Sequence, residues 1–194
     1  MTKSFVHLHA HTEYSMLDGA AKIVDYLKKV KELNQPAAAI TDHGNLYGAM
    51  EFVQKANDFG IKPIIGYEAY ITPGSRFDRP DRENNKRYHL TLLAENNIGY
   101  QNLVELVSKA YTEGYYYKPR IDYELLDQHH DGLIALSGCL GGELAQHLAP
   151  DGSVEEGNTS NERSFEKALD IAKKYQSIFG KENYFIEILS LIHI

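Results

Sequence analysis

The sequence lacks the features that mark secreted or membrane proteins. It has a single cysteine, Cys139, so no disulfide can form within the chain, and the thiol is free for burial or for a metal. Histidines interrupt the start of the chain, which therefore has no apolar run of the length that a secretory signal needs. These absences predict a cytoplasmic protein with no membrane partner.

Positive charge is also scarce. The chain has 20 Lys and Arg against 27 Asp and Glu, which gives a net charge of −7. Such a surface repels phosphate unless basic residues cluster or bound cations reverse the local sign. We expect no duplex binding by this segment alone, and if the substrate is a nucleic acid, metal ions should supply most of the neutralising charge.

The pattern that is present indicates one α/β domain. Short apolar runs alternate with helical patterns, as in βα units around a parallel sheet or barrel. The expected strands are Phe5–His9, Ala37–Thr41, Pro63–Tyr70, Tyr88–Ala94, Leu133–Ser137 and Tyr184–Ile188. Helices are expected over 23–33, 46–59 and 100–111, and from a capping box at Thr159 and Glu162 to Gly180, with surface loops at 73–87 and 149–158.

Potential metal ligands follow the strands. Alternation places His7, His9 and His11 on one side of the first strand, and Asp18 comes a short turn later. Later strands lead to Asp42 and His43, to Glu68, to His89 and to Cys139. Active sites of barrels lie at the carboxyl ends of their strands. Imidazoles with carboxylates suit zinc, manganese or iron, so we expect a metal site there.

Several of these residues also have an ordinary interpretation. His129, His130 and His147 are expected to be common polar residues, whereas His7 either supports a ligand or binds metal. Cys139 is either a small buried residue or a ligand. The arginines of 76–87 alternate with acids, which favours a solvated loop over a phosphate track. Tyr115, Tyr116 and Tyr117 either stack on unpaired bases or fill an interface, and we favour the interface.

Five segments together resemble one family. They read HAHTEYSMLDGAAKI, AAAITDHGNLYGAMEF, KPIIGYEAYI, HLTLLAENNIGYQNLVEL and LIALSGCLGGE, and they span almost the entire chain. They are similar to successive blocks of the polymerase and histidinol phosphatase (PHP) domain, in the version at the front of the alpha subunit of bacterial DNA polymerase III. This combination discriminates far better than a single short motif.

The resemblance implies a fold and a metal site. The fold would be α/β, a distorted TIM-like PHP barrel of βα units that is incomplete at its C-terminal end. The site would hold a trinuclear cluster of divalent ions, with zinc or manganese favoured and iron or magnesium as alternatives. The family's ligands, which act in catalysis through these ions, fall on His9, His11, Asp18, His43, Glu68, His89 and Cys139.

The implied activity is a metal-dependent 3′–5′ exonuclease within a DNA-directed DNA polymerase. Its partners would be the primer 3′ end of DNA, dNTPs through the parent polymerase, and other polymerase III holoenzyme subunits. No Ser-His-Asp pattern indicates a protein nucleophile, and closely spaced divalent ions can activate water instead. Two alternatives stay open: a non-catalytic structural module that docks a proofreading subunit, and a free-standing phosphoesterase.

The resemblance weakens at the C-terminal end. The family continues with an Asp and a His in a later strand, whereas here the six residues 189–194 read LSLIHI. That hexapeptide resembles the translation of a transposon-end sequencing adapter. We therefore expect an incomplete PHP domain over 1–188 and a non-native tail over 189–194, in which His193 is not a ligand.

Overall fold

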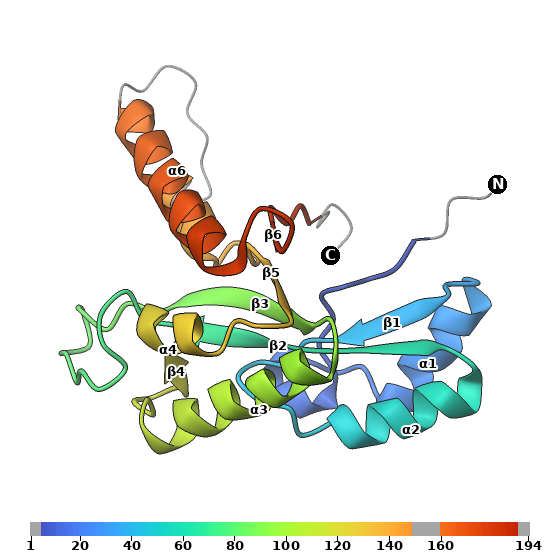
Figure 1. The fold of residues 1–194 in the computed structure, drawn as a ribbon. Coiled ribbons are helices and arrows are strands. Elements are labelled where there is room, and N and C mark those ends of the chain that lie inside the picture. Colours follow the sequence, from blue (N-terminus) through green and yellow to red (C-terminus); the bar gives the residue numbers. More distant parts are fainter. Residues whose placement is uncertain (1–4, 149–159, 190–194) are drawn as a thin grey trace.

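The centre of the molecule is one mixed sheet. The computed structural model describes residues 5–148 and 160–189, without the side chains of 160–163. The described strands run in the order β1-β2-β3-β5-β6, and β4 pairs with the end of β2 (Figure 1). Their bounds are β1 Ala37–Ile40, β2 Lys62–Ile71, β3 Tyr88–Ala94, β4 Arg120–Ile121, β5 Leu133–Leu136 and β6 Tyr184–Phe185. The expected α/β class is confirmed.

Strand β3 runs against its neighbours. β1 and β4 are parallel to β2, and β6 is parallel to β5, but β3 is antiparallel to both β2 and β5. The expected parallel order is therefore wrong at this strand. Because of this reversal, the first residues of β3 lie at the edge of the sheet where β2 and β5 end.

Helices cover one face of the sheet and one end of it. In Figure 1, α1, α2 and α3 lie along one face, whereas α6 stands beside β5 and β6, where it packs against α5. The helical bounds are η1 Glu13–Asp18, α1 Ile23–Glu32, α2 Ala49–Phe59, α3 Asn97–Thr112, α4 Tyr123–Gln128, α5 Glu143–Leu148 and α6 Ser160–Phe179. Within the described ranges, no helix combines the length and apolar character needed to cross a lipid bilayer.

Local sequence signals explain where these helices lie. Ile23, Leu27 and Val30 are buried along one side of α1, as their spacing predicts. Helix α2 ends at Gly60, which adopts the expected left-handed conformation with φ of 70°. Helix α3 begins at Asn96, whose side chain accepts hydrogen bonds from two backbone N–H groups of the first turn. The expected capping box at Thr159 and the loop over 149–158 fall outside the described residues.

The first expected strand, Phe5–His9, does not form. Its residues pair with no strand among the described residues, and Phe5 is 65% exposed, so within the described ranges this segment lacks the neighbouring strand that a sheet requires. The residue after it is bonded to the end of β1: the Ala10 N–H donates to Thr41 Oγ1 at 2.9 Å, and the Thr41 N–H donates to the Ala10 carbonyl at 2.8 Å. The last strand is also shorter than expected. Of the expected tail, only Leu189 is described.

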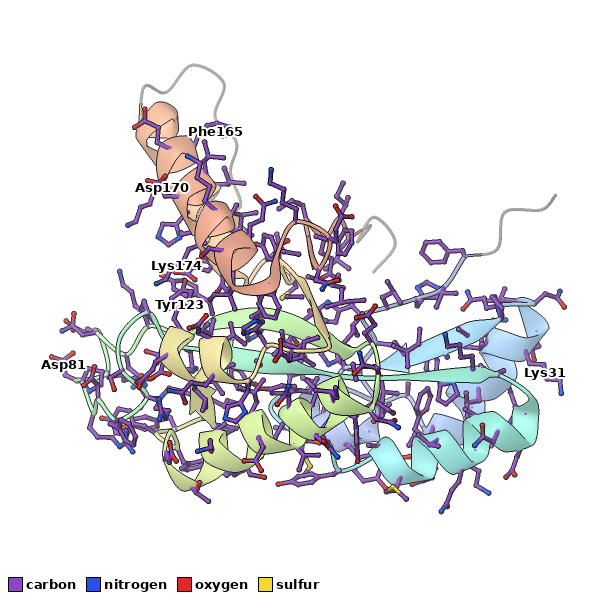
Figure 2. The ribbon with its side chains drawn as sticks, in the orientation of Figure 1. Lys31, Asp81, Tyr123, Phe165, Asp170 and Lys174 are labelled. Atoms are coloured by element: carbon purple, nitrogen blue, oxygen red, sulfur yellow. The ribbon has the colours of Figure 1, made fainter. Side chains whose placement is uncertain are left out.

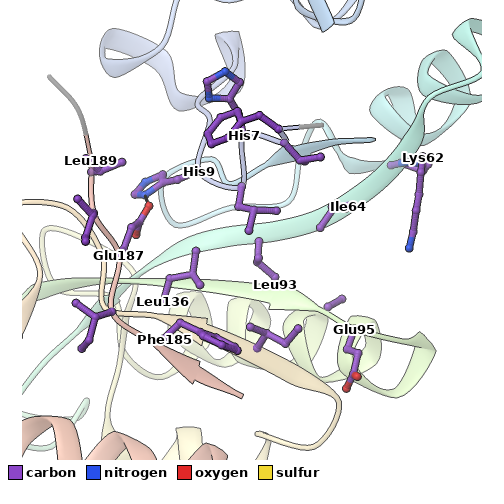
Figure 3. Close-up of a pocket in the computed structure, with 18 residues that line it drawn as sticks. His7, His9, Lys62, Ile64, Leu93, Glu95, Leu136, Phe185, Glu187 and Leu189 are labelled. Carbon is purple, nitrogen blue, oxygen red and sulfur yellow. Dashed lines mark hydrogen bonds and ion pairs between the residues drawn. The ribbon is translucent and has the colours of Figure 1, made fainter. Parts of the chain in front are cut away.

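The second face of the sheet borders a cavity of about 660 Å³. Ile64, Leu93, Leu136 and Phe185 line it from four different strands, and the extended segment 5–9 lines its opposite side (Figure 3). Most of the lining is apolar, but His9 and Glu187 contact each other at one end. The sheet thus has an apolar second face that ends at a polar cluster.

Candidate metal centre

Glu68 lies at the centre of the polar cluster. It sits inside β2, opposite Thr91 of β3, and a backbone bridge joins it to His43. Its side chain is completely buried. Burying an ionised carboxylate is costly unless charges or donors compensate it. The Glu68 carboxylate therefore needs charged or hydrogen-bonding partners, and the backbone pairing of β2 does not supply them.

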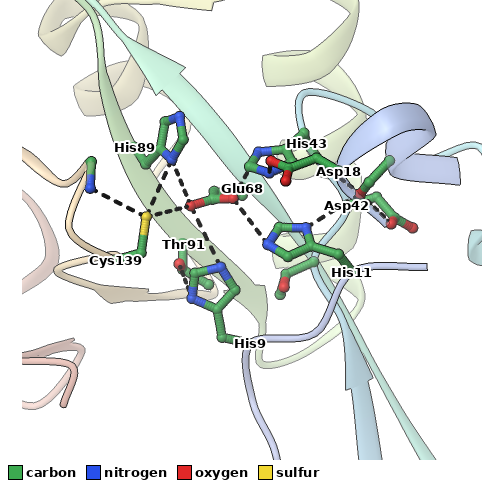
Figure 4. Close-up of polar contacts among 12 residues, drawn as sticks. His9, His11, Asp18, Asp42, His43, Glu68, His89, Thr91 and Cys139 are labelled. Atoms are coloured by element: carbon green, nitrogen blue, oxygen red, sulfur yellow. Dashed lines mark hydrogen bonds and ion pairs between the residues drawn. The ribbon is translucent and has the colours of Figure 1, made fainter. Parts of the chain in front are cut away.

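Four imidazoles face the Glu68 carboxylate (Figure 4). His43 Nδ1 and His89 Nδ1 approach its oxygens to 2.8 and 2.9 Å. His11 Nε2 and His9 Nε2 lie at 3.2 and 3.5 Å. The rings of His11 and His43 stack with their centroids 4.2 Å apart. Nitrogen atoms that are remote in sequence are thus gathered around one carboxylate.

Cys139 and Asp18 complete the cluster on opposite sides. The Cys139 thiol lies 3.4 Å from Glu68 Oε1 and 3.3 Å from His89 Nδ1. Asp18 reaches His43 Nε2 at 2.7 Å, and its side chain is 77% exposed. The structure therefore brings together all the site residues expected from sequence, and Cys139 lies in the polar cluster, not in the apolar core.

The reversed direction of β3 explains how His89 reaches this cluster. His89 is the second residue of β3, so the antiparallel pairing carries it to the edge where β2 and β5 end. The loop after β5 approaches it closely: the His89 N–H donates to the Gly141 carbonyl at 2.9 Å. Gly138 begins this loop with φ of 82°, and a Cβ there would lie 2.8 Å from the His89 carbonyl oxygen.

The charges of the cluster depend on each other. Burial raises the pKa of Glu68, but the close contacts of its carboxylate with the imidazoles of His43, His89 and His9 outweigh it and hold the pKa well below its usual range. Burial lowers the pKa of His9, yet hydrogen bonds to Glu187 and Glu68 raise it to about 9. His89 also has its pKa raised to about 9 against the effect of burial, through Cys139 and Glu68. For His11 burial dominates, and its pKa is lowered.

Ser15 connects Asp42 to the His11 imidazole and to the backbone of His43. The Ser15 hydroxyl donates to Asp42 at 2.6 Å, and its oxygen accepts from the His43 backbone N–H at 3.1 Å. Since the only hydroxyl proton is used, the 3.2 Å contact with His11 Nδ1 assigns the imidazole proton to Nδ1. The His11 Nε2 lone pair then faces the cluster. Asp42, a possible ligand by sequence, acts here as an acceptor for Ser15 and Thr12.

Glu187 was not expected at the site. Its carboxylate accepts a hydrogen bond from His9 Nδ1 at 2.7 Å, and the Thr91 hydroxyl donates to its other oxygen at 3.4 Å. A carboxylate that holds Nδ1–H leaves Nε2 free, which is the usual arrangement behind a metal-binding histidine. The available signal was an acidic residue inside the apolar run of the last strand.

Other histidines lie elsewhere. His7 is exposed and packs edge-on against Phe5 at 4.8 Å between ring centroids, beside the apolar cavity. His130 and His147 contact backbone carbonyls at 2.6 and 2.7 Å, and His129 contacts Asn102. His193 is not among the described residues. Among the described side chains, these histidines belong to neither group that could hold a metal.

The donor set fits divalent metal ions. Two groups of side chains have ligand atoms within 4.8 Å of one another, His9 with His11 and Glu68, and His43 with Glu68 and His89. Glu68 Oε2 and His43 Nδ1 are buried and 2.8 Å apart, but neither makes a hydrogen bond of good geometry. Imidazole nitrogen, carboxylate oxygen and thiolate sulfur are ligands for zinc and related ions. The shared Glu68 places one carboxylate between two sets of nitrogens.

Comparisons with known proteins point to a family. A family profile described as "PHP domain" matches residues 7–190. The DNA polymerase III subunit alpha of Thermus aquaticus is 52% identical over 192 residues, which is 95% of this chain and 14% of that protein. The same subunit of Deinococcus radiodurans is 51% identical, over 96% of this chain and 14% of that protein. The chain thus spans about a seventh of the length of these relatives.

Solved structures give a weaker comparison. A protein from Bifidobacterium adolescentis to which metal-dependent phosphoesterase activity has been attributed aligns with a TM-score of 0.42 at 15% identity. The alignment covers 96% of this chain and 59% of that one. This similarity is too low to carry an argument about the site, which rests on the family match and on the geometry above.

Proposed function

Because the chain belongs to the PHP domain family, we propose that it is the PHP domain of a bacterial DNA polymerase III alpha subunit and hydrolyses phosphodiester bonds with divalent metal ions. The observation that carries this proposal is the convergence of four imidazoles on the buried Glu68. Residues that only stabilise a fold do not require such a concentration of ligand atoms. The expected ligands His9, His11, Asp18, His43, Glu68, His89 and Cys139 form this proposed site.

The side chains divide the work between binding and orientation. Bound divalent ions would supply Lewis acidity and lower the pKa of a water at this position. Glu68 offers its two oxygens to the two groups of nitrogens. Ser15 and Glu187 fix the imidazole protons of His11 and His9 on Nδ1, so that both Nε2 atoms face inward. Asp18 is the most exposed member, and it lies where solvent and substrate can enter.

From the names of the relatives we infer a more specific activity, that of a 3′–5′ exonuclease acting on a primer 3′ end. The relatives are named DNA polymerase III subunit alpha, and a polymerase produces mismatched 3′ ends that a neighbouring nuclease can remove. On this proposal the partners are DNA, dNTPs at the parent polymerase site and the other holoenzyme subunits. The proposed location is the cytoplasm, where a bacterial replication enzyme works.

The test is removal of a mismatched 3′ nucleotide by the complete chain encoded by the gene that carries this sequence. Purified protein loaded with manganese or zinc is given a primer with a mismatched 3′ end, and shortened products are measured. We expect His9→Ala and Asp18→Asn to abolish shortening, because each removes a proposed ligand. His130→Ala is the matched control, because it removes an imidazole outside the cluster.

Three results would separate the alternatives. Shortening that persists in His9→Ala and Asp18→Asn would show a contaminating nuclease and contradict the proposal. Metal binding that raises thermal stability without any shortening would favour the structural module. Hydrolysis of small phosphomonoesters but not of DNA would favour the free-standing phosphoesterase.

A further inference from the structure

A second cavity, of about 390 Å³, opens directly beside the candidate metal centre. We call it the tyrosine cleft. His43 and Asp18 form its inner wall, so it shares two residues with the cluster around Glu68. Its other walls carry six tyrosines, Tyr14, Tyr47, Tyr70, Tyr111, Tyr115 and Tyr117. A cavity of this volume accommodates a small organic group.

The aromatic rings of the cleft are available to a ligand. Tyr47, Tyr115 and Tyr117 are 59%, 54% and 65% exposed. Tyr111 stacks on Tyr115 with centroids 6.0 Å apart and ring planes inclined by 24°. Tyr47 lies 6.5 Å from Tyr111. Several exposed rings at one cavity are unusual on a surface that carries no binding site.

The cleft continues to the metal centre through stacked rings. Tyr70 lies nearly parallel to His43, with centroids 5.9 Å apart and an angle of 17°. The Lys118 ammonium lies 5.2 Å from the centre of the Tyr70 ring. One positive charge therefore lies over a ring of the cleft that also stacks on a proposed ligand.

The loop that carries Tyr117 has an unfavourable backbone conformation. Tyr117 has φ of 62°, a region that residues with a Cβ rarely adopt. Consecutive side chains of this loop contact different parts of the molecule. Tyr117 and Lys118 line the cleft, whereas the Tyr116 hydroxyl donates to the Pro80 carbonyl at 2.8 Å. Strain of this kind costs energy and is typical of functional positions. The consecutive tyrosines thus have different roles: Tyr115 and Tyr117 line the cleft, whereas the Tyr116 hydroxyl is bonded outside it.

We propose that the tyrosine cleft binds the unpaired nucleobase of the DNA strand whose phosphodiester is hydrolysed at the metal centre. The proposal rests on the proposed function, because it deepens the description of the same site. Stacking suits this chain, since a net charge of −7 gives little general attraction for phosphate and aromatic rings accept any base. Lys118 would pair with a phosphate of the bound strand. Frayed 3′ ends would then be preferred over paired ones.

The first experiment compares two single-stranded oligonucleotides that differ only in the last residue, which carries a base or is abasic. The complete chain, loaded with manganese, should cleave the base-bearing end with a kcat/KM about 5- to 150-fold higher, the factor that base stacking supplies. In Tyr47→Leu and Tyr115→Leu this ratio should fall toward one. Tyr47→Phe should keep the ratio, because it keeps the ring. Phe165→Leu is the matched control, because Phe165 is an exposed ring on α6 that projects away from the sheet (Figure 2).

The second experiment needs no hydrolysis. Binding of dAMP and of deoxyribose 5-phosphate to the complete chain is followed by saturation-transfer NMR, and Tyr115→Leu should remove the advantage of dAMP. If dAMP is preferred in this way but no DNA is cleaved, the proposed function is wrong and the base subsite stands. If DNA is cleaved and the leucine variants keep the wild-type base preference, the base subsite is wrong. Loss of subunit assembly in those variants, with unchanged base preference, would assign the tyrosines to a protein interface.

Discussion

Two buried glutamates in this molecule have opposite surroundings. Glu68 in β2 faces four imidazoles, whereas Glu143, at the start of α5, faces phenols. Glu143 is 6% exposed, and its carboxylate accepts hydrogen bonds from Tyr123 and, at 2.9 Å, from Tyr175. Both carboxylates are compensated, but only one has partners that can also bind a metal.

The difference shows that burial of an acid does not by itself indicate a metal site. A phenol donates a hydrogen bond but keeps its proton, so it remains neutral. It therefore satisfies the Glu143 carboxylate and is not itself a metal ligand. Imidazole nitrogens can release their protons and bind metal in their place. Among the described residues, both groups that could hold a metal contain Glu68, and neither contains Glu143.

The most direct test of this contrast replaces one carboxylate oxygen of each glutamate by an amide nitrogen. Glu68→Gln should lower metal affinity by more than about 100-fold, beyond the loss typical of residues that only support a ligand. Glu143→Gln should leave metal content unchanged. The measurement is metal per chain by mass spectrometry after dialysis. An equal loss in both variants would break the distinction.

A smaller effect is expected from Glu187, which contacts the cluster only through His9. Glu187→Ala should weaken metal binding by about 10- to 100-fold, because His9 loses the acceptor that keeps its proton on Nδ1. Titration of the metal-free chain with zinc against a competing chelator measures this change. Glu182→Ala, which removes an exposed acid nearby, is the control. Unchanged affinity in Glu187→Ala would show that the 2.7 Å contact does not orient the ligand.

At the other glutamate, stability should change while metal content does not. Glu143→Ala leaves the hydroxyls of Tyr123 and Tyr175 without their acceptor, which should reduce the free energy of unfolding by about 1–3 kcal/mol. Urea denaturation measures it. A loss of metal in Glu143→Ala would mean that the two glutamates are coupled.

The smallest effect is a difference in pH dependence. Burial and the charge of Glu143 raise the pKa of Tyr123, Tyr175 and Tyr184 above the unfolded value near 10. Their stabilisation is complete below about pH 10 and is lost as pH rises through the folded pKa values, so the free energy of unfolding should fall above about pH 10.

Tyr184→Phe isolates this contribution. The Tyr184 hydroxyl is buried and has no hydrogen-bond partner among the described residues, so its removal should change stability at pH 7 by less than about 1 kcal/mol. Above about pH 10 the variant should lose stability less steeply than the parent chain, which urea denaturation at several pH values measures. Identical slopes would show that Tyr184 does not titrate with the others.

The positions of the site residues could be predicted where a residue able to bind metal lies at or after the end of a predicted strand. Periodicity located β1, β2 and β5, and each leads to an expected ligand at one edge of the sheet. It did not predict that β3 is reversed, because an apolar run has no direction. His89 lies in the cluster for a different reason than expected: it is the second residue of a strand, whereas Glu68 lies within one and His43 and Cys139 follow one.

The supporting residues were not predictable. The contact between His9 and Glu187 joins residues 178 apart in sequence, and no local pattern specifies such a neighbour. Ser15 lies in η1, a short helix with a non-helical residue at Met16, which periodicity does not detect. Phe5–His9 has the alternation of a strand but no partner among the described strands, so pattern without pairing gave the wrong assignment.

The distance in sequence between His9 and Glu187 has a consequence for folding. The cluster gathers side chains from both ends of the described chain, so its contact between His9 and Glu187 cannot form before residue 187 has been synthesised. Contacts of such high sequence separation are made late, after the loop-closure entropy of the intervening chain has been overcome. Full metal affinity would therefore be reached only after this contact has formed. The strength of metal binding would then report whether the two ends of the described chain have come together.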